Sequence, residues 1–410
     1  MSSAALRLAA LGGLAFHLAA CAPVATGAGA EKSTGGPAAA AGNAATVRTA
    51  PSRPNAATPD VAAPVARAPA KKLPPLPVTR IKGRDYFAVA DVAKRTGFKS
   101  TWVEARRELT LSANTRRLVL AAEKREVACN GVRIFLGDAV QIRDGALFVS
   151  KTDYERCLLP LLRPDQVEVP APRLKTIVLD PGHGGGDPGM ENRPLKLQEK
   201  VLALEIALRL EKLLKAEGYS VVLTRRDDRQ LAPSKEADLQ RRALIANTAR
   251  ADLFISIHFN SLFPNTLVSG TEVYVFTRPR QRSDQSWGYG QADDTENEIA
   301  PVNRHDPWTS LLAHSLHRET IAGLKTSDRG HKTKHLAVLR GLNCPGVLVE
   351  AVFLSNDEEA RRVVSPAYRQ KIAESFAAGI RTYAAALGVS APKSPPLTET
   401  RAQPSSSNSP

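Results

Sequence analysis

Short apolar runs alternate with longer amphipathic segments between about residues 174 and 388 of the chain. An apolar run of about four to eight residues is typical of a buried strand, and an apolar residue at every third or fourth position is typical of a helix. The runs predict strands at Lys175–Leu179, Val221–Leu223, Leu253–Ile257, Thr271–Phe276, Leu336–Leu339 and Val347–Ala351. The helical spacing predicts helices at Pro194–Glu217, Glu236–Ala249, Trp308–Leu324, Asp357–Val364 and Tyr368–Leu387. Strands that alternate with helices favour an α/β domain, residues 174–388, in which helices cover both faces of a mostly parallel sheet in three layers.

Residues 78–165 carry shorter runs that predict a separate, smaller domain. A helix is expected at Val89–Thr96. The strand candidates that follow it are Leu109–Leu111, Leu118–Leu120, Val132–Phe135 and Ala146–Val149. The pairs Asn130-Gly131 and Asp144-Gly145 are typical of tight hairpin turns. The sequence therefore predicts a small α+β domain in front of the larger one.

The two flanking segments have a different composition. Residues 21–77 are rich in Ala and Pro, residues 389–410 are rich in Pro and Ser, and both hold few large apolar side chains. Such segments cannot bury enough apolar surface to offset the entropy lost on ordering. We expect a disordered tether before the small domain and a disordered tail after the larger domain.

Residues 1–20 are typical of an export signal, because a basic residue precedes an apolar run that is too short to span a bilayer comfortably. The run ends in Leu18-Ala19-Ala20-Cys21, which resembles the lipobox of bacterial lipoproteins. The resemblance implies cleavage before Cys21 and anchoring to a membrane through a lipid on its sulfur. Ala22 is compatible with sorting to an outer membrane. The alternative is an ordinary signal peptide cut near the same place, and either way we expect an exported, periplasmic protein.

The net charge of the chain limits the classes of molecule that it is expected to bind. Lys and Arg number 56 against 41 Asp and Glu, which gives a formal net charge of +15. A basic chain suits an anionic polymer such as cell wall, an anionic lipid or nucleic acid. The sequence holds no recognition helix, zinc-finger spacing or aromatic RNA-binding motif, so nucleic acid is not expected.

Export permits disulfides, and two cysteines, Cys129 and Cys157, lie in the small predicted domain. A bridge between them is possible. The sequence alone leaves their redox state open.

Two polar segments follow the first strand of the larger domain. The glycine-rich turn at residues 180–189 presents His183 at the end of a buried strand. Glu199 lies near the start of the following helix, where its carboxylate can reach a metal bound by His183. Taken alone, Glu199 is better explained as a solvent-facing carboxylate near a helix N-terminus.

Two further polar residues mark the ends of later strands. An apolar strand ends at His258, and Glu350 interrupts another apolar run. A lone histidine at a strand end is more often structural. A buried carboxylate without a partner is costly, and a water molecule bound to a metal is one partner that Glu350 can have.

Together these segments closely resemble the zinc-dependent N-acetylmuramoyl-L-alanine amidases of family 3, which act on cell walls. The matching stretches are 179–189, Glu199-Lys200, Arg242 with Ala246-Asn247, 256–261, 328–330 and 347–356. The resemblance implies that His183, Glu199 and His258 bind Zn²⁺ and that Glu350 is the catalytic glutamate. It also implies hydrolysis of the amide between N-acetylmuramic acid and the first L-alanine of the peptidoglycan stem peptide.

The residue types suit that chemistry. Two imidazoles and one carboxylate leave the fourth tetrahedral position of zinc open, as a catalytic site requires. Glu350 is expected to take a proton from the attacking water and pass it to the leaving amine. Asn260 or a backbone N–H is a candidate to stabilise the oxyanion.

The small domain loosely resembles the copper amine oxidase N-terminal domain, and we weigh wall or partner binding against a spacer role.

The remaining candidates surround this predicted site. His314 and His317 are expected on a solvated or partly packed helix face, and His331 and His335 are candidates to line a substrate groove. The long connection 277–307 is expected to form a substrate flap that carries Trp287 and Tyr289, and a regulatory lid over the zinc is the alternative.

Two alternatives to the amidase function remain. One is a zinc peptidase that cuts elsewhere in the stem peptide, and the other is an inactive lipoprotein that binds the wall. The sequence does not identify an activator protein.

Overall fold

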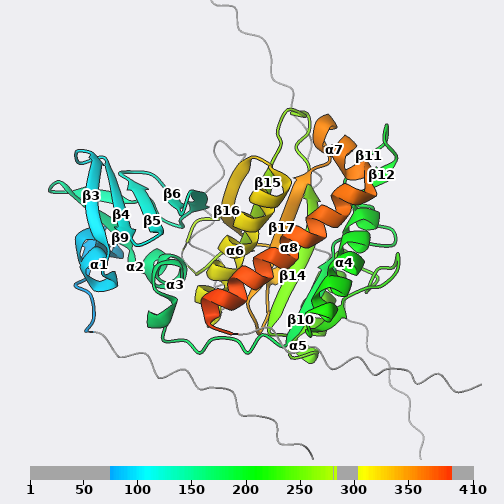
Figure 1. Cartoon of the computed structure of the whole chain (residues 1–410), viewed down its shortest axis with the longest axis horizontal. Helices are drawn as coiled ribbons and strands as arrows, with labels where there is room; N and C mark the ends of the chain where they lie inside the picture. The colour runs from blue at the N-terminus through cyan, green and yellow to red at the C-terminus, as the bar shows by residue number, and fades with distance from the viewer. Residues whose placement is uncertain (1–73, 280, 284–302, 390–410) are drawn as a thin grey trace, which may run out of the picture. The chain divides into compact units, whose positions relative to one another are not determined.

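The computed structural model describes residues 74–279, 281–283 and 303–389 (Figure 1). The expected export signal, the lipidation site at Cys21, nearly all of the tether, the tail from residue 390 and the expected flap residues Trp287 and Tyr289 lie outside the described residues. No helix within the described ranges is long and apolar enough to cross a membrane.

One sheet runs through the larger domain in the order β13–β10–β14–β17–β15–β16 (Figure 1). All neighbouring strands in this order are parallel except β15 and β17, which are antiparallel. The mostly parallel sheet predicted for this domain is therefore confirmed. The strand bounds are β10 (Thr176–Pro181), β13 (Ser220–Leu223), β14 (Leu253–Asn260), β15 (Thr271–Phe276), β16 (Asp328–Lys334) and β17 (Gly346–Phe353).

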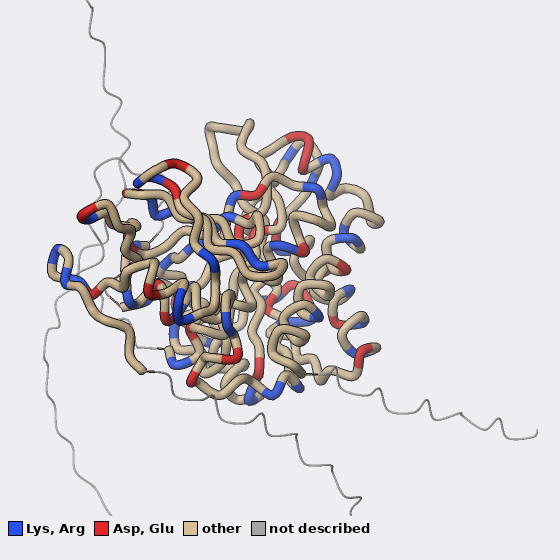
Figure 2. Tube along the Cα trace, turned by 60° about the vertical axis from the view of Figure 1, so that its left-hand side comes forward, with Lys and Arg blue, Asp and Glu red and all other residues tan. Residues whose placement is uncertain are grey.

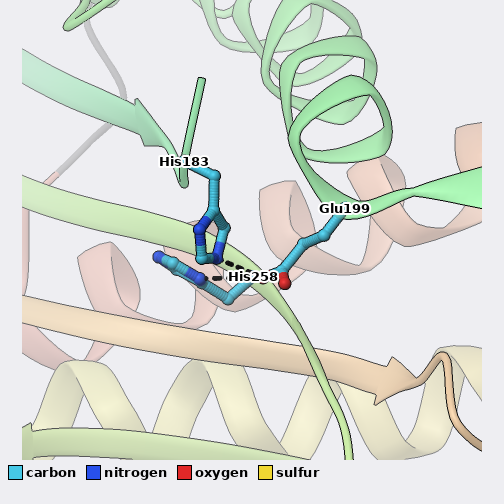
Figure 3. Close-up of side chains that lie close together, drawn as sticks. All are labelled: His183, Glu199 and His258. Atoms are coloured by element: carbon cyan, nitrogen blue, oxygen red, sulfur yellow. Dashed lines mark hydrogen bonds and ion pairs between the residues drawn. The ribbon is translucent and has the colours of Figure 1, made fainter. Parts of the chain in front are cut away.

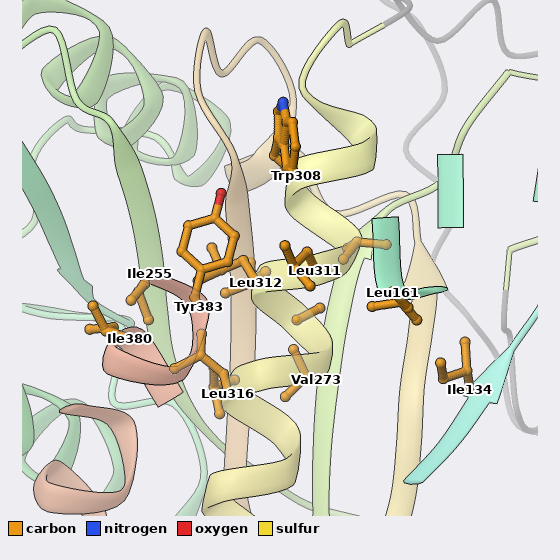
Figure 4. Packing of buried hydrophobic residues seen from close by; sticks show 14 of the residues in the cluster. Ile134, Leu161, Ile255, Val273, Trp308, Leu311, Leu312, Leu316, Ile380 and Tyr383 are labelled. Atoms are coloured by element: carbon orange, nitrogen blue, oxygen red, sulfur yellow. The ribbon is translucent and has the colours of Figure 1, made fainter. Parts of the chain in front are cut away.

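Helices cover both faces of this sheet, as predicted. One face packs against α4 (Glu199–Ala216), α6 (Asp306–Leu324) and α8 (Pro366–Leu387). The other face packs against α5 (Lys235–Thr248) and the short 3₁₀ helix η3 (Ala337–Leu339). The helix α7 (Asp357–Val364) contacts β17 and α8. The α6–α8 side holds the two largest fully buried side chains of the described residues, Trp308 and Tyr383 (Figure 4).

The small domain consists mainly of antiparallel strands. A meander of five strands is formed by β3 (Lys99–Glu104), β4 (Glu108–Ala113), β5 (Arg116–Ala121), β6 (Glu126–Cys129) and β7 (Val132–Phe135). A second sheet holds β1 (Thr79–Ile81), β2 (Arg84–Ala88), β8 (Gln141–Arg143) and β9 (Ala146–Ser150), and the predicted helix forms α1 (Val89–Thr96). Short helical turns at α2 (Lys151–Asp153), η1 (Tyr154–Leu158), α3 (Leu159–Leu162) and η2 (Pro164–Gln166) follow. Cys129 and Cys157 are buried free thiols, so the possible bridge is not formed.

The meander continues the sheet of the larger domain. Strand β7 pairs in parallel with β16, and His331 lies opposite Ile134. The backbone N–H of Arg133 donates to the Asp328 carboxylate over 2.8 Å. The apolar core is also continuous across the junction, from Ile255 under α8 to Ile134 on β7 (Figure 4). The small domain therefore covers an edge strand that would otherwise expose unpaired backbone groups.

Two predicted elements of the larger domain were wrong. The helix predicted from Pro194 begins at Glu199, because a hairpin of β11 (Glu191–Asn192) and β12 (Leu197–Gln198) precedes it. The strand predicted at Leu336–Leu339 is the 3₁₀ helix η3, in which the adjacent residues Val338 and Leu339 are both buried instead of alternating as a strand requires. The strand β16 was not predicted, because its residues Asp-Arg-Gly-His-Lys-Thr-Lys form no apolar run.

A substitution at Gly330 tests how closely the two domains pack at their junction. Its φ is +96°, and a Cβ placed there would lie 2.6 Å from Cε2 of Phe135 on β7. We expect Gly330→Ala to lower the free energy of unfolding by about 1–3 kcal/mol more than Gly341→Ala, because only the first substitution overpacks a contact. Gly341 is a matched control with a φ of +79° and nothing within 4 Å of its added Cβ. Equal losses in chemical denaturation would show that the junction is not closely packed.

Candidate metal centre and active site

Two buried guanidinium groups hold the turn that carries His183. Arg242 donates to the carbonyl oxygens of Pro181 and His183, each over 2.8 Å. Arg225 donates to the carbonyl oxygens of Pro181 over 3.0 Å and Gly182 over 2.7 Å. His183 has a φ of +60°, which is uncommon for a residue with a side chain. The two arginines therefore fix a backbone conformation that the chain would not hold unaided.

The charge of Arg242 is balanced by a buried carboxylate at the end of β10. Arg242 Nη1 lies 2.9 Å from Asp180 Oδ1, and both side chains are almost fully buried. The hydroxyls of Thr224 and Ser256 donate to the same carboxylate over 2.6 and 2.7 Å. Burial opposes the charge of Asp180, but Arg242 and the two hydroxyls hold the pKa of its carboxyl below the ordinary value. This network ties β10, β13, β14 and α5 together directly beneath the turn.

Glu199 is the first residue of α4, and its buried carboxylate meets both histidines (Figure 3). Its Oε1 atom lies 3.1 Å from His183 Nε2 and 2.9 Å from His258 Nδ1. Its Oε2 atom accepts a hydrogen bond from the backbone N–H of Met190 over 2.8 Å. Burial would raise the pKa of Glu199, but the hydrogen bonds with His183 and His258 hold it far below its ordinary value. The carboxylate is therefore aimed between the two imidazoles.

His258 lies on β14, next to the turn that carries His183. The two imidazole rings stand 4.9 Å apart, centroid to centroid. Gly182 makes this approach possible, since a Cβ at that position would lie 2.3 Å from His258 Cε1. One ligand atom from each of His183, Glu199 and His258 lies within 4.8 Å of the other two, and no other group of three candidate ligands does so among the described residues. Two imidazole nitrogens and one carboxylate oxygen form a donor set that fits zinc.

Asp187 orients the first of these imidazoles and was not singled out from the sequence. Its Oδ2 atom lies 3.0 Å from His183 Nδ1, on the side of the ring away from Glu199. A hydrogen bond from Nδ1 leaves Nε2 as the nitrogen with a free lone pair. The residue was overlooked because the Gly-Asp-Pro-Gly sequence around it is typical of a turn.

Glu350 lies on β17, opposite His258 on one side and Glu272 on the other. Its Oε2 atom is buried and has no hydrogen-bond partner among the described residues. Burial, and then the nearby carboxylates of Glu199 and Glu272, raise the pKa of Glu350 well above its ordinary value. A carboxyl group in this environment has a strong tendency to take up a proton.

A polar cleft of about 550 Å³ opens beside the three candidate ligands. It is lined by His183, Asp187, Gly189, Met190, Glu191, Arg193, Glu199, Lys235 and Ser261. Two of the candidate ligands, His183 and Glu199, therefore face a space that a substrate can enter.

The other histidines and Asn260 do not lie where the sequence suggested. His314 and His317 are buried on α6, with 5% and 0% exposure, and His331 is equally buried on β16. The solvated or partly packed face predicted for the first pair and the groove position of His331 were therefore wrong, because α6 is enclosed by α8, by β15, β16 and β17 of the sheet, and by η1 and α3. His335 is half-buried and contacts the Phe276 ring. The Asn260 amide donates to Glu272 over 2.7 Å, so that it is not directed at the cleft as an oxyanion donor.

Comparison with known families gives two matches. Residues 177–382, half of the chain, match the family described as N-acetylmuramoyl-L-alanine amidase. Residues 70–153 match the family described as copper amine oxidase N-terminal domain.

Individual proteins match over the same half. The germination-specific N-acetylmuramoyl-L-alanine amidase of Bacillus subtilis is 33% identical over 218 residues, which cover 51% of this chain and 79% of that protein. An uncharacterized cell wall amidase of Bacillus anthracis is 32% identical over 212 residues, and the chain spans only 35% of its length. A crystal structure of an N-acetylmuramoyl-L-alanine amidase from Clostridium difficile 630 shares 27% identity, with a TM-score of 0.41, and the match covers 52% of this chain and 97% of that one.

The contact between Asp187 and His183 predicts an effect on metal affinity. We expect Asp187→Ala to weaken binding of Zn²⁺ to the metal-free protein by about 10- to 100-fold, because His183 loses the acceptor that orients its ring. Competition with a chromophoric chelator measures the affinity without any substrate. Asp227→Ala is the matched control, since Asp227 is an exposed carboxylate paired with Arg229. An unchanged affinity in Asp187→Ala would exclude an orienting role.

Proposed function

The chain belongs to the N-acetylmuramoyl-L-alanine amidase family, and we propose that it hydrolyses the amide between N-acetylmuramic acid and L-alanine in the peptidoglycan stem peptide. The proposal rests mainly on one juxtaposition: three side chains suited to a single metal ion lie beside Glu350, whose buried Oε2 atom has no hydrogen-bond partner among the described residues. The reaction breaks an amide, so a protein of this kind remodels cell walls by removing stem peptides from glycan strands.

We infer that the metal is Zn²⁺ and that His183, Glu199 and His258 hold it. His183 would bind through Nε2 and His258 through Nδ1, since these are the nitrogens that face Glu199 Oε1. When bound, a zinc ion polarises the scissile carbonyl and lowers the pKa of a coordinated water to about 7.

Glu350 would then act as general base and general acid. Its carboxylate accepts a proton from the attacking water and returns it to the amine of the departing L-alanine. Burial favours the protonated form after the first transfer, and the missing donor at Oε2 leaves that oxygen available for it. The same carboxyl can therefore serve both halves of the reaction.

The surface charge suits an anionic wall polymer. Lys and Arg are interspersed with Asp and Glu along the described chain in the view of Figure 2. Two basic residues, Arg193 and Lys235, line the cleft beside the candidate ligands. The same cleft also carries Asp187, Glu191 and Glu199, so the attraction to an anionic polymer rests on the net charge of +15 and not on the cleft itself.

We further propose that the chain works outside the cytoplasm as a periplasmic lipoprotein anchored through Cys21. The proposed domain organisation suits an anchored enzyme. It has a tether at 21–77, a small domain at 78–165 and a catalytic domain at 174–388. Two separate family matches, over residues 70–153 and 177–382, support a division into a small and a larger domain.

Digestion of purified peptidoglycan tests the reaction itself. We expect mass spectrometry to find stem peptides with a free N-terminal L-alanine, together with glycan strands that carry unsubstituted lactyl groups. EDTA should abolish the products, and added Zn²⁺ should restore them. New ends inside the stem peptide would instead identify a zinc peptidase, and the absence of any product would support a binding protein.

Glu350→Gln separates catalysis from metal binding. We expect this variant to retain one zinc ion per chain and to lose about 10²- to 10⁴-fold in kcat, because Gln cannot carry the proton. Zinc content by elemental analysis and turnover on the same sample give the two readouts. Glu358→Gln, at an exposed carboxylate paired with Arg362, is the control and should match the wild type. Loss of zinc from Glu350→Gln would make Glu350 a ligand instead of a base.

A further inference from the structure

A second pocket lies beside the cleft of the candidate metal centre, where the β11–β12 hairpin meets the first turns of α4. Its volume is about 330 Å³, and its lining residues all fall within 191–202, so we call it the hairpin pocket. Figure 1 shows β11 and β12 beside α4. Glu191 and Arg193 line both the hairpin pocket and the cleft that holds His183 and Glu199. A ligand seated at the candidate metal centre can therefore continue into the hairpin pocket.

Three of the side chains that line the hairpin pocket are aliphatic. Leu197 is half-buried, Leu202 is buried, and Val201 is 51% exposed although it lies in the first turn of α4. Together they offer apolar surface that the methylene groups of a ligand can cover.

Two cations stand over this apolar surface. Arg193 and Lys196 lie on the turn between β11 and β12, and both are exposed. Neither side chain has an ion-pair or hydrogen-bond partner among the described residues. An arginine offers a planar pair of N–H groups that matches a carboxylate in a bidentate contact. Arg193 is the better placed of the two, because it lines both spaces.

The acidic residues of the two spaces already have partners. Glu191 Oε1 accepts a hydrogen bond from Gln198 Nε2 over 3.0 Å. Asp187 pairs with His183, and Glu199 meets both candidate histidine ligands. The charge that has no partner at the hairpin is therefore positive.

The hairpin that carries Arg193 is firmly held. Asn192 is 8% exposed, and its Nδ2 atom donates to the carbonyl oxygen of Leu354, just after β17, over 3.0 Å. Its Oδ1 atom accepts from the backbone N–H of Leu195 over 3.2 Å. The backbone N–H of Met190 donates to Glu199 over 2.8 Å. The hairpin is thus fixed to the strand of Glu350 and to a candidate metal ligand, as expected of a largely pre-formed binding site.

The dimensions suit a peptide that runs from the metal centre to the hairpin. A cleft of about 550 Å³ is on the order of 10 Å across if it is taken as a sphere. An extended residue spans about 3.5 Å, so a carboxylate two residues beyond the scissile amide lies roughly 7 Å from it. Arg193, at the boundary of the two spaces, is within reach of such a carboxylate.

We propose that the hairpin pocket is a subsite for the part of the stem peptide that follows L-alanine, and that Arg193 binds a carboxylate there. The ligand class is an anionic peptide, because a cation and an aliphatic surface lie side by side. This inference rests on the proposed function, to which it adds the recognition of the substrate.

The test uses the full, zinc-loaded chain and two soluble substrates. The first is N-acetylmuramoyl-L-alanine extended by one acidic residue, and in the second the carboxylates of that residue are amidated. We expect Arg193→Gln to raise KM for the acidic substrate by about 10-fold, with kcat within about twofold of the wild type and no change in KM for the amidated one. Arg193→Lys should recover part of the loss, because it keeps the charge but not the paired N–H groups.

Lys371→Gln is the matched control, since it removes one positive charge at an exposed position of α8. It should leave both KM values unchanged. An equal rise in Lys371→Gln and Arg193→Gln would reduce the effect to net charge and overturn the proposal. Equal losses on the acidic and amidated substrates in Arg193→Gln would also overturn it, because a merely structural role of the hairpin does not distinguish the two compounds.

The aliphatic side of the pocket is tested separately. We expect Val201→Glu to raise KM for the acidic substrate by about five- to tenfold, because it removes apolar surface and repels a carboxylate. Leu244→Glu on α5 is the control, since Leu244 is 50% exposed and lies outside both spaces. Equal KM values for the two variants would place the peptide outside the hairpin pocket.

Calorimetry separates this inference from the proposed function. Binding of the acidic compound is compared between Glu350→Gln and Glu350→Gln/Arg193→Gln, which requires no turnover. An affinity about 10-fold weaker in the double variant supports the subsite, and equal affinities refute it. If the wild type hydrolyses neither compound, the proposed function fails and calorimetry alone decides the subsite. If it hydrolyses both with the same KM, only the subsite fails.

Discussion

The buried ion pair between Arg242 and Asp180 is the interaction on which the candidate metal centre depends. It places a full positive charge beneath a turn that has few side chains of its own, and that charge is what the carbonyl oxygens of Pro181 and His183 bind. A buried pair of this kind contributes little net stability, and loss of one partner is costly. Its role here is conformational: it holds His183 at a positive φ, with the imidazole turned toward Glu199 and His258.

Other polar residues of the sheet also have partners on neighbouring strands. His258 on β14, Glu350 on β17 and Glu272 on β15 lie opposite one another across three neighbouring strands, and β10, which carries Asp180, pairs with β14 on its other side. Contacts continue from Glu272 through Lys332 to Phe135, and so into the small domain. The sequence predicts the small domain as a separate unit. In the structure it is joined to the catalytic sheet by strand pairing and by a shared core.

The sequence was informative where one residue type interrupts a uniform pattern. His258 and Glu350 stand out because each follows or breaks an apolar strand, and the turn at His183 stands out because of its glycines. Glu272 was not singled out, because a polar residue near the start of a predicted strand is common and gives no sign of its partners. His314 and His317 were misplaced for a related reason: their helix contains neighbouring charges such as Arg318 and Glu319, but both histidines are buried and His317 lies 2.7 Å from Asp328 on β16. Contacts between segments far apart in the chain decide such cases, and local pattern does not encode them.

The central claim is that His183, Glu199 and His258 bind one metal ion, and the position of that ion tests it most directly. An anomalous difference map at the zinc edge, from crystals of the full chain grown with Zn²⁺, locates it directly. We expect a single strong peak about 2.0–2.2 Å from His183 Nε2, His258 Nδ1 and a carboxylate oxygen of Glu199, with Glu350 outside bonding distance. A peak that includes Glu350 as a ligand, or one seated among His314, His317 and His331, would contradict the account.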